Sequence, residues 1–337
     1  MKLALSVIVC THNPRPDYLR RALDALRAQT LAMDQWELIL IDNCSDTPIE
    51  ERFDLSWHPD GRHVREAELG LTPARLRGIR EAKGEYLVFV DDDNLLAPDY
   101  CEVLLQLRER FAQIGCFGAG VIEPEFEVVP QPDVEPYLPS LALRSAEKAA
   151  WSNNPQDRVI PWGAGLAVHR DVAACYLNTV AGCPIRRRLD RSGSSLVSGG
   201  DEEFSWVACE SGYGKGLFPE LKVTHLIAAR RVEKDYILRL AEGQAFSGTL
   251  LAHIHGGQIN SPKRSIFADI LYNILRARVS VALYHANSWW GSRHKSAMER
   301  TFDNAWRSGV ELALRQLAEM EQGQSNSGDL SGSRLHA

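Results

Sequence analysis

The stretch Val88-Phe89-Val90-Asp91-Asp92-Asp93-Asn94 joins an apolar run directly to three adjacent acids. The apolar, β-branched part is typical of a buried strand. Like charges at this spacing raise one another's pKa values unless a hard divalent cation is shared between the carboxylate oxygens. The stretch therefore predicts a metal site at the end of a buried strand, a position that is typical of phosphate chemistry.

Strands and helices alternate on both sides of this stretch, which is the pattern of a mostly parallel sheet with helices on its faces. The strands that we expect are residues 3–10, 36–41, a short one near 63–64, 86–90, 116–122 and one that ends at 225. The helices that we expect are residues 17–29, 72–83, 98–111 and 198–210. Ligands of such doubly wound α/β folds bind outside the carboxyl ends of the strands, which is where the polar clusters of this sequence lie.

The pattern of apolar and polar residues changes along the chain. The α/β pattern runs to residue 230, with a proline-rich, irregular excursion at residues 124–139. The pattern is helical from 231 to 322, and residues 323–337 are polar and rich in glycine and serine. We therefore expect an α/β domain over 1–230, a helical C-terminal extension over 231–322 and a disordered tail over 323–337.

The composition narrows the classes of function. The chain has 337 residues, of which 45% are hydrophobic and 24% charged, as is usual for a globular protein. A net charge of −6 argues against a nucleic-acid polymer as partner. Seven cysteines without paired spacing predict reduced thiols in a cytoplasmic protein. Charged residues and a histidine interrupt the most apolar long segment, residues 266–290, so no membrane span is expected, while peripheral contact with the inner membrane face stays open.

Five short motifs then occur in a fixed order along the chain. They are Ser6-Val7-Ile8-Val9-Cys10-Thr11-His12-Asn13, Asp42-Asn43-Cys44-Ser45-Asp46, residues 70–75, Asp91-Asp92-Asp93 and Gly200-Asp201-Glu202-Glu203-Phe204. Together they resemble family 2 of the inverting glycosyltransferases, which have the GT-A fold, and the resemblance covers roughly residues 3–228. It implies that residues 1–230 form a catalytic GT-A domain. The implied reaction moves a sugar from a nucleotide-diphosphate donor, with a UDP-sugar expected, to a hydroxyl of a carbohydrate or lipid-linked acceptor in polysaccharide or glycoconjugate biosynthesis.

The resemblance implies a donor-nucleotide site made of Thr11, Asn13, Asp42, Arg75 and Asp92. On the residue chemistry alone, the turn is the favoured interpretation of Asp42, and a solvated helical face is the favoured interpretation of Arg75. The motif that contains Arg75 departs from the family pattern, because Leu76 and Glu68 stand where asparagine is common.

The resemblance also implies that Asp91, Asp93 and His225 hold Mn²⁺ or Mg²⁺, which neutralises charge on the leaving phosphate. The alternatives are an acidic turn after the strand and a histidine that packs at a strand end.

Asp201 is the expected catalytic base, which takes the proton of the acceptor hydroxyl. The alternative for a helix-opening aspartate is an N-cap. The acid that usually precedes this aspartate in the family is replaced by Gly200, and if the matching frame is wrong, Glu202 becomes the base. On the acceptor side we expect Trp162, Gly163, Gly165, Gly200 and Glu202. The cluster Arg186-Arg187-Arg188 either contacts an anionic acceptor or forms a solvated loop.

Two other classes compete with a transferase. A nucleotidyltransferase would carry a glycine-rich loop with Arg and Lys after the first strand, whereas this chain has Thr11-His12-Asn13-Pro14 there. A sugar-binding or nucleotide-binding module without activity would keep the fold and lose the base. In the helical extension, Trp289 and Trp290 lie near Arg293 and Lys295, which leaves three alternatives: an interfacial surface, a homodimer face, or a bundle that packs on the sheet.

Overall fold

The computed structural model describes residues 3–256 and 296–329. It divides into two compact units, the first made of residues 1–195 and 199–233 and the second of residues 196–198 and 234–337. The α/β domain was expected to end at residue 230, and the first unit ends at residue 233. Each unit is described separately below.

Parallel strands form one half of the sheet in the first unit. Their order is β3-β2-β1-β4, and all neighbours in this half run parallel. The bounds are Leu5–Thr11 (β1), Trp36–Asn43 (β2), Gly61–Glu66 (β3) and Tyr86–Asp91 (β4). Every residue of β2 is buried, as expected for a strand covered on both faces.

The other half of the sheet is mixed, and it continues from β4 in the order β9-β6-β10-β5. Strand β9 is antiparallel to β4 and β6, whereas β6 and β10 are parallel. The bounds are Asn94–Leu96 (β5), Ile114–Phe126 (β6), Arg144–Ser145 (β7), Ala150–Ser152 (β8), Leu166–His169 (β9) and Gly214–Ile227 (β10). The short strands β7 and β8 pair with β6 and β10, respectively.

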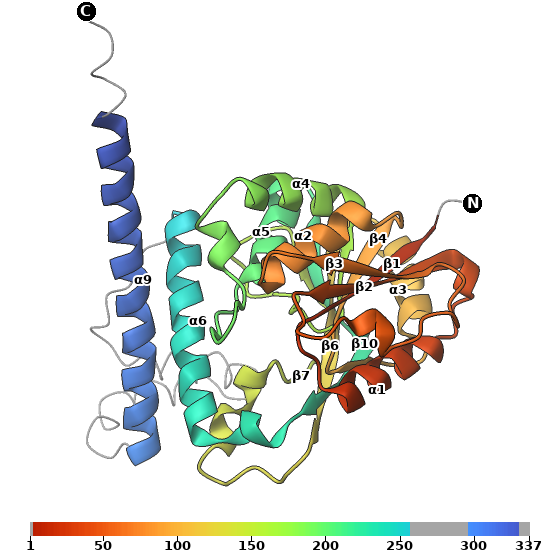
Figure 1. The fold of residues 1–337 in the computed structure, drawn as a ribbon, viewed down its shortest axis with the longest axis horizontal. Coiled ribbons are helices and arrows are strands. Elements are labelled where there is room, and N and C mark those ends of the chain that lie inside the picture. The colour runs from red at the N-terminus through yellow and green to blue at the C-terminus, as the bar shows by residue number, and fades with distance from the viewer. Residues whose placement is uncertain (1–2, 257–295, 330–337) are drawn as a thin grey trace, which may run out of the picture. The chain divides into compact units, whose positions relative to one another are not determined.

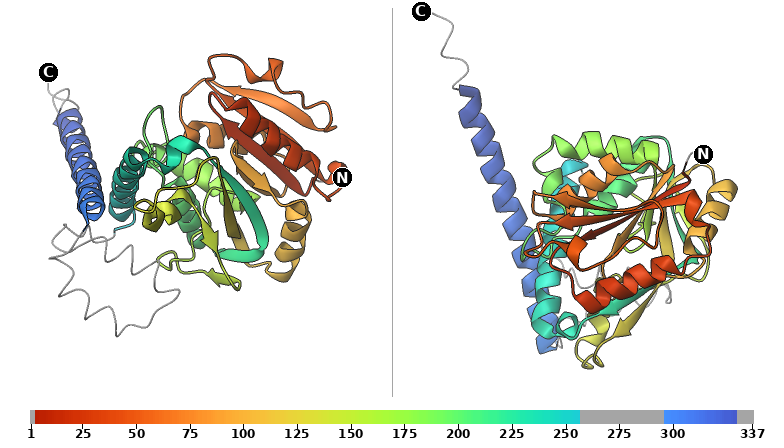
Figure 2. Two further views of the ribbon diagram at one scale, coloured as in Figure 1. Left: turned by 90° about the horizontal axis from the view of Figure 1, so that it is seen from below. Right: turned by 45° about the vertical axis from the view of Figure 1, so that its right-hand side comes forward.

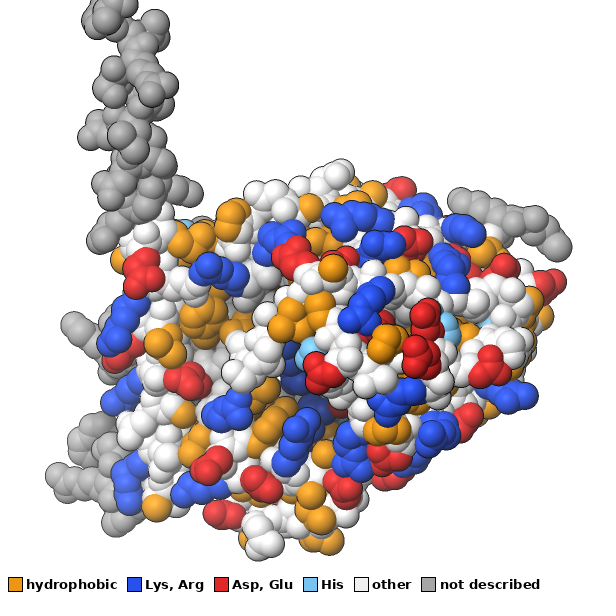
Figure 3. Space-filling view, in the orientation of Figure 1, with side chains coloured by type: hydrophobic (Ala, Val, Ile, Leu, Met, Phe, Trp, Pro, Cys, Tyr) orange, Lys and Arg blue, Asp and Glu red, His pale blue; other side chains and the backbone are white. Residues whose placement is uncertain are grey.

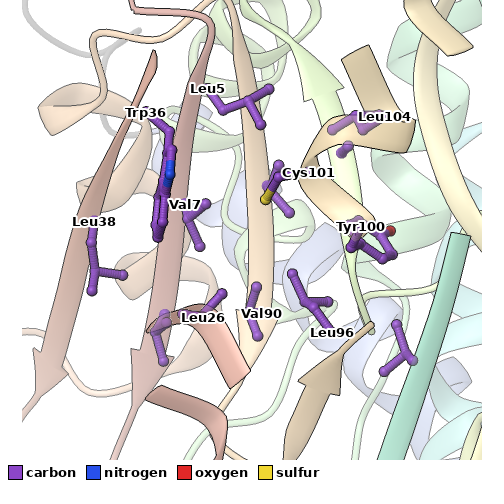
Figure 4. Close-up of a cluster of buried hydrophobic side chains, with 14 of the residues drawn as sticks. Leu5, Val7, Leu26, Trp36, Leu38, Val90, Leu96, Tyr100, Cys101 and Leu104 are labelled. Atoms are coloured by element: carbon purple, nitrogen blue, oxygen red, sulfur yellow. The ribbon is translucent and has the colours of Figure 1, made fainter. Parts of the chain in front are cut away.

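Helices cover both faces of this sheet (Figures 1 and 2). Side chains that alternate along the strands form two apolar layers. One layer includes Leu23 and Leu26 of α1 and Leu104 of α3, and Figure 4 shows part of it. The other is covered by α2, α4 and α5. The bounds are Pro16–Arg27 (α1), Leu71–Glu81 (α2), Tyr100–Arg110 (α3), Arg170–Ala181 (α4) and Gly200–Glu210 (α5), with 3₁₀ turns at Met33–Gln35 (η1), Ile49–Glu51 (η2), Glu135–Leu141 (η3), Arg186–Arg188 (η4) and Ala229–Val232 (η5).

The prediction of an α/β fold with a mostly parallel core of strands is confirmed, but several elements were missed. No strand was expected at β9 and no helix at α4, and the two elements follow one another directly. Strand β9 has only four residues, which is too short for a periodic signal. The excursion expected at residues 124–139 starts later than predicted, because β6 runs to Phe126, and it includes most of η3.

Strand register decides which loops share an edge. Thr11 at the end of β1 lies opposite Asp42 of β2, and Cys10 lies opposite Asp91 of β4. Because these strands are parallel, the loops that follow them leave the sheet on the same side. The polar motifs of the sequence are therefore collected at one edge.

The second unit contains two long helices, α6 (Lys234–Ile254) and α9 (Ala297–Asp329). They pack closely around Gly309, where an added Cβ would lie 2.1 Å from the Glu242 carbonyl oxygen. Ser308 Oγ donates to Glu242 Oε1 at 2.5 Å. Residues 323–329 were expected to belong to a disordered tail, but helix α9 continues through them. Once a helix is formed, each added residue adds one backbone hydrogen bond. Trp289, Trp290, Arg293 and Lys295 lie outside the described residues.

Acidic and basic side chains are interspersed on the face drawn in Figure 3. Among the residues that the structure describes, no helix is long and apolar enough to cross a membrane.

Candidate active site

The acid cluster lies in the turn between β4, which ends at Asp91, and β5, which begins at Asn94. Thr11, at the end of the neighbouring strand, donates a short hydrogen bond through Oγ1 to Asp92 Oδ2. The register of β1 with β4 makes this contact, because it sets the two strand ends side by side. Two residues expected at the donor-nucleotide site are thus in direct contact.

Negative charge in the cluster is incompletely compensated. Burial raises the pKa of Asp91, the Asp93 charge raises it further, and Arg75 and Arg191 oppose this. Burial and the Asp93 charge likewise raise the pKa of Asp92 to about 7, against the hydrogen bond from Thr11. Carboxylates in this condition bind an additional cation favourably.

His225 reaches the cluster through the pairing of β10 with β5, which sets it opposite Asn94. Its Nε2 lies 3.5 Å from Asp93 Oδ2. Arg231, on η5, contacts both side chains, since its Nη1 lies 2.6 Å from Asp93 Oδ2 and 2.9 Å from His225 Nε2. Burial opposes ionisation of Asp93, but His225 and Arg231 together lower its pKa below the usual range. The structure thus brings Asp93 and His225 together and adds an arginine that the sequence analysis did not name.

Asp91, Asp93 and His225 supply part of the donor set that a divalent cation needs. Within residues 3–256 and 296–329, no group of three His, Cys, Asp or Glu side chains is arranged to hold a metal. Ions such as Mg²⁺ in nucleotide sites commonly take one or two carboxylates together with substrate phosphate oxygens, so a complete protein cage is not required. The carboxylates of Asp91 and Asp93 and the imidazole of His225 are donors of the right kind. His225 Nδ1 is buried without a hydrogen-bond partner among the described residues, whereas Nε2 contacts both Arg231 and Asp93.

The loop after β2 is held by Asp42, whose carboxylate is fully engaged. Its Oδ1 accepts from the Ser45 N–H at 3.0 Å, which is the turn contact considered in the sequence analysis. Its Oδ2 accepts from Arg65 Nη1 at 2.8 Å. Arg65, on β3, is a half-exposed cation at the expected base-binding position, and it was not foreseen.

Side-chain amides tie this loop to its neighbours. Asn13 has a left-handed backbone with φ of 47°, and its N–H donates to Ser45 Oγ at 3.0 Å. Asn43 Nδ2 donates to the Glu68 carbonyl at 2.7 Å, and Asn43 Oδ1 accepts from Gly70 N–H at 2.8 Å. The loops that follow β1, β2 and β3 are therefore joined into one rim.

Arg75 lies in the interior and not on a solvated helical face, with 4% of its side chain exposed. Its Nη1 donates to both oxygens of Asp190, at 3.1 and 3.0 Å. Burial alone would lower the pKa of Arg75, but Asp190, Asp91 and Asp201 are close enough that the net shift is upward. Leu76, where the family has asparagine, is buried in the apolar layer with α4 and α5.

Asp201 opens α5 and is half-buried. Its Oδ2 accepts from the Gly163 N–H and its Oδ1 from the Glu202 N–H, both at 3.0 Å. Burial raises the pKa of Asp201, with Arg75 opposing and Asp190 adding to the shift. The Asp201 carboxylate is thus a more basic group than an exposed aspartate.

The residues expected on the acceptor side have different environments. Arg144 lies over the Trp162 ring, 3.5 Å from its centroid. Gly163 contacts Arg75 and Asp201, and Gly165 has a φ of 74° with its carbonyl bound by the Tyr100 hydroxyl. Gly200 is buried, and the Asp190 carboxylate fills the space at its Cβ position, so this position faces a side chain of the protein and not an acceptor. Burial lowers the pKa of Lys215, and Glu202 lies near enough to oppose this shift.

Two members of the arginine cluster on η4 are used within the protein. Arg186 pairs with the buried Glu203 of α5, and Arg187 pairs with Glu68 before α2. Arg188 is exposed. The cluster therefore anchors its loop, which corrects the alternative of a freely solvated one.

Several residues of this site had no signal in the sequence. Asp190 lies in an aperiodic polar loop, and Arg144 follows the proline-rich excursion. Arg231 belongs to a pair of arginines shortly after the last strand, which is the one hint that the sequence offered.

Comparison with known proteins agrees with the fold and with the family that the sequence resembles. A model of the family described as Glycosyl transferase family 2 matches residues 6–176. The putative glycosyltransferase EpsH of Bacillus subtilis is 33% identical over 105 residues, which cover 31% of this chain and 30% of that protein. The uncharacterized glycosyltransferase YibD of Escherichia coli is also 33% identical over 105 residues, with the same shares covered. The chain thus spans about a third of the length of these curated relatives.

A solved structure resembles the chain over more of its length. The mannosyltransferase PcManGT from Pyrobaculum calidifontis, in complex with GDP-Man and Mn²⁺, has a TM-score of 0.57 and 18% identity, and the match covers 93% of this chain and 88% of that one. At this identity the likeness concerns the fold, which is of the GT-A type. Since the family model also matches half of the chain, from β1 into α4, this protein belongs to glycosyl transferase family 2.

Proposed function

We propose that this protein is an inverting, metal-dependent glycosyltransferase that moves a sugar from a nucleotide-diphosphate donor, a UDP-sugar in the first instance, to a hydroxyl acceptor. One observation carries the proposal. Asp91 of the acid cluster and Asp201 of α5, more than a hundred residues apart, both act on the buried guanidinium of Arg75. Together with the closeness of Arg75 Nη2 and Asp201 Oδ2 to the same Gly163 Cβ position, at 2.7 and 4.0 Å, this supports assigning the leaving-group half and the base to a single site.

The donor end is assigned to the rim formed by the loops after β1, β2 and β3, together with the adjoining turn after β4. Thr11, Asn13, Asp42 and Asp92 line this rim, and Arg65 adds a donor-rich guanidinium beside Asp42. Asp91, Asp93 and His225 would hold Mn²⁺ or Mg²⁺. When bound, this ion neutralises charge on the leaving diphosphate. The GDP-Man and Mn²⁺ held by the structurally similar mannosyltransferase agree with a donor and an ion of these classes.

Asp201 is assigned the role of general base. Its raised pKa makes it a better proton acceptor than an exposed aspartate, and Gly163 and Glu202 N–H groups fix its orientation. The acceptor hydroxyl gives its proton to Asp201 as its oxygen bonds to the anomeric carbon. The bond from that carbon to the phosphate oxygen breaks at the same time, and its electron pair leaves with the diphosphate. A single displacement of this kind inverts the anomeric centre.

The acceptor is assigned to the side of Asp201 on which Trp162, Gly163, Gly165 and Glu202 lie. Arg144 stacks on Trp162. Burial lowers the pKa of Arg144 to about 10, and the nearby charge of Asp201 opposes this shift. A cation next to an aromatic ring suits a carbohydrate that carries a phosphate, as a lipid-linked acceptor does.

Donor turnover tests this proposal. The purified protein is incubated with Mn²⁺ and a panel of UDP-, GDP- and dTDP-sugars, and released nucleotide is measured with and without EDTA. We expect slow hydrolysis of one donor, its loss with EDTA, and an inverted anomeric centre in the sugar product by NMR. Asp201→Asn should lower turnover by about 10²- to 10⁴-fold with donor binding retained.

The competing classes give different results in the same assay. A binding module would bind a nucleotide-sugar without turnover in any condition. A nucleotidyltransferase would release pyrophosphate from a nucleoside triphosphate and a sugar phosphate. Unchanged turnover in Asp201→Asn would remove the base assignment and make Glu202 the next variant to measure.

A further inference from the structure

Asp190 is a buried carboxylate in the loop between η4 and α5, and it contacts three residues of the site on two helices. Its Oδ2 accepts from Thr72 Oγ1 at 2.9 Å, and both oxygens accept from Arg75 Nη1. Its Oδ1 also accepts from the Gly200 N–H at 3.2 Å. The carboxylate therefore links α2 to the residue that precedes Asp201.

Gly200 is what admits this carboxylate. A Cβ built on Gly200 would lie 2.2 and 2.6 Å from the two Asp190 oxygens and 2.6 Å from its Cγ. The φ of Gly200 is outside the left-handed region, so the backbone itself would accept a side chain. The obstacle at position 200 is thus the Asp190 carboxylate.

The same distances show that two sequence positions can supply one carboxylate. Within an aspartate, the Cβ and the carboxylate oxygens are about 2.4 Å apart, from standard bond lengths. The Asp190 oxygens lie at nearly this distance from the Cβ position of residue 200. An aspartate at 200 therefore has the reach to put its oxygens close to where Asp190 now holds them, in a rotamer that points the same way.

Arg75 is fixed by this contact in a particular orientation. Nη1 is held by Asp190, and Nη2 points toward Gly163, whose Cβ position is 2.7 Å away from it. That Cβ position lies 4.0 Å from Asp201 Oδ2. One nitrogen of the guanidinium is thus anchored while the other faces the neighbourhood of the proposed base.

We propose that Asp190 is a positioning residue for the transfer reaction: it supplies, from a loop, the carboxylate that orients Arg75 beside Asp201, and the glycine at 200 exists to admit it. This inference rests on the proposed function. A purely structural ion pair would affect stability alone. A positioning role predicts that kcat depends on where the carboxylate lies, whether residue 190 or residue 200 carries it.

The test moves the carboxylate within the full-length protein. Asp190→Asn removes the charge with little change in shape, and Asp190→Ala combined with Gly200→Asp returns a carboxylate from α5. We expect Asp190→Asn to lower kcat by about 10²-fold, the order of a small misplacement in an active site, with donor KM changed by less than about threefold. We expect the double variant to recover at least about tenfold of this loss.

The pH profile separates positioning from stability. Asp201 is faced by Arg75 from α2, by Asp190 from its loop, by Arg144 and by Tyr176 of α4. Removing the Asp190 charge leaves Arg75 less compensated, so the acid limb of kcat should move to lower pH in Asp190→Asn. Glu37→Gln is the matched control, since Glu37 is also a buried, arginine-paired carboxylate but lies toward the other end of β2, about 16 Å of strand from Asp42. It should lose thermal stability without a shift of the acid limb.

Each outcome is decisive. Wild-type turnover that is absent with every donor overturns the proposed function and this inference with it. An active wild type together with an Asp190→Asn variant of unchanged kcat and pH profile overturns the inference alone. So does a folded double variant, judged by Tm and donor binding, that stays as slow as Asp190→Ala. If the double variant does not fold, Asp190→Asn still decides.

Discussion

Gly163 lies between Asp201, the proposed base, and Arg75, and it has no side chain that would push the two apart. Its N–H binds Asp201, and its Cα faces Arg75 Nη2. In Gly163→Ala the added Cβ would lie 2.7 Å from that nitrogen, so the pair must separate by 0.7 Å to reach the 3.4 Å at which ordinary contact begins. Arg75 cannot give way freely, because Asp190 holds its other nitrogen.

The size of the effect follows from this displacement. A misplacement of about 1 Å at an active site can cost about 10²-fold in rate, so a forced shift somewhat smaller than this should lower kcat by roughly 10- to 100-fold. Overpacking a buried position also costs about 1–3 kcal/mol of folding free energy. The Gly163 N–H remains, and donor binding should therefore stay within about threefold of wild type, since the rim that holds the nucleotide is made by other loops.

The assay compares kcat, donor Kd and Tm for Gly163→Ala and Gly182→Ala. Gly182 follows the last residue of α4 with a φ of −91°, and among the described residues no atom outside its chain neighbours lies within 4 Å of its Cβ position. The control should match wild type in all three measurements. The reasoning is refuted if Gly163→Ala keeps wild-type kcat, or if donor binding falls as far as kcat does.

Three further predictions concern charges. First, kcat of the wild type should fall at acid pH through an apparent pKa above that of an exposed aspartate, because burial raises the pKa of Asp201; a limb at the usual aspartate value in a rate profile under saturating donor would count against the assignment. Second, Arg231→Ala should bind Mn²⁺ on the order of tenfold more tightly in the absence of donor, because its guanidinium otherwise occupies Asp93 and His225; EPR titration of Mn²⁺ measures this, and equal or weaker binding would contradict it. Third, Glu37→Gln should lower the free energy of unfolding by about 2 kcal/mol at pH 7. Burial of Glu37 opposes ionisation, but Ser6, Arg62 and the Lys83 N–H lower its pKa, so this stability is present above the unfolded pKa and is lost as pH falls through the folded one. Urea unfolding at pH 7 and at successively lower pH should show the difference between variant and wild type shrink.

The sequence was informative wherever one strand carried the signal. The run from Val88 to Val90 predicted a buried strand, and the acids after it predicted where a site would lie. Asp42 and Thr11 could be placed at the same edge because parallel strands end together, and their register agrees with this. In each case the relevant physics is local, since burial and chain direction of one element decide where its last residues point.

The sequence was uninformative where a contact depends on pairing between distant segments. Strand β9 has four residues and is antiparallel to both of its neighbours, so neither its length nor its pattern marks it. His225 was named, but its partner Arg231 was not, because a 3₁₀ turn after the strand turns the arginine back onto Asp93.

By itself, the sequence determined that this protein has an α/β fold, with acids after one strand and an aspartate opening a later helix. Those features follow from periodicity and from strand ends, which are properties of neighbouring residues, and the resemblance of the five motifs to a known family implied the GT-A type. Only the tertiary structure decided that Asp190 fills the space left by Gly200, that Arg75 is a buried cation shared among acids, and that Arg231 occupies Asp93 and His225. These contacts join residues that are distant along the chain, and a carboxylate or guanidinium is placed by the space that packing leaves for it.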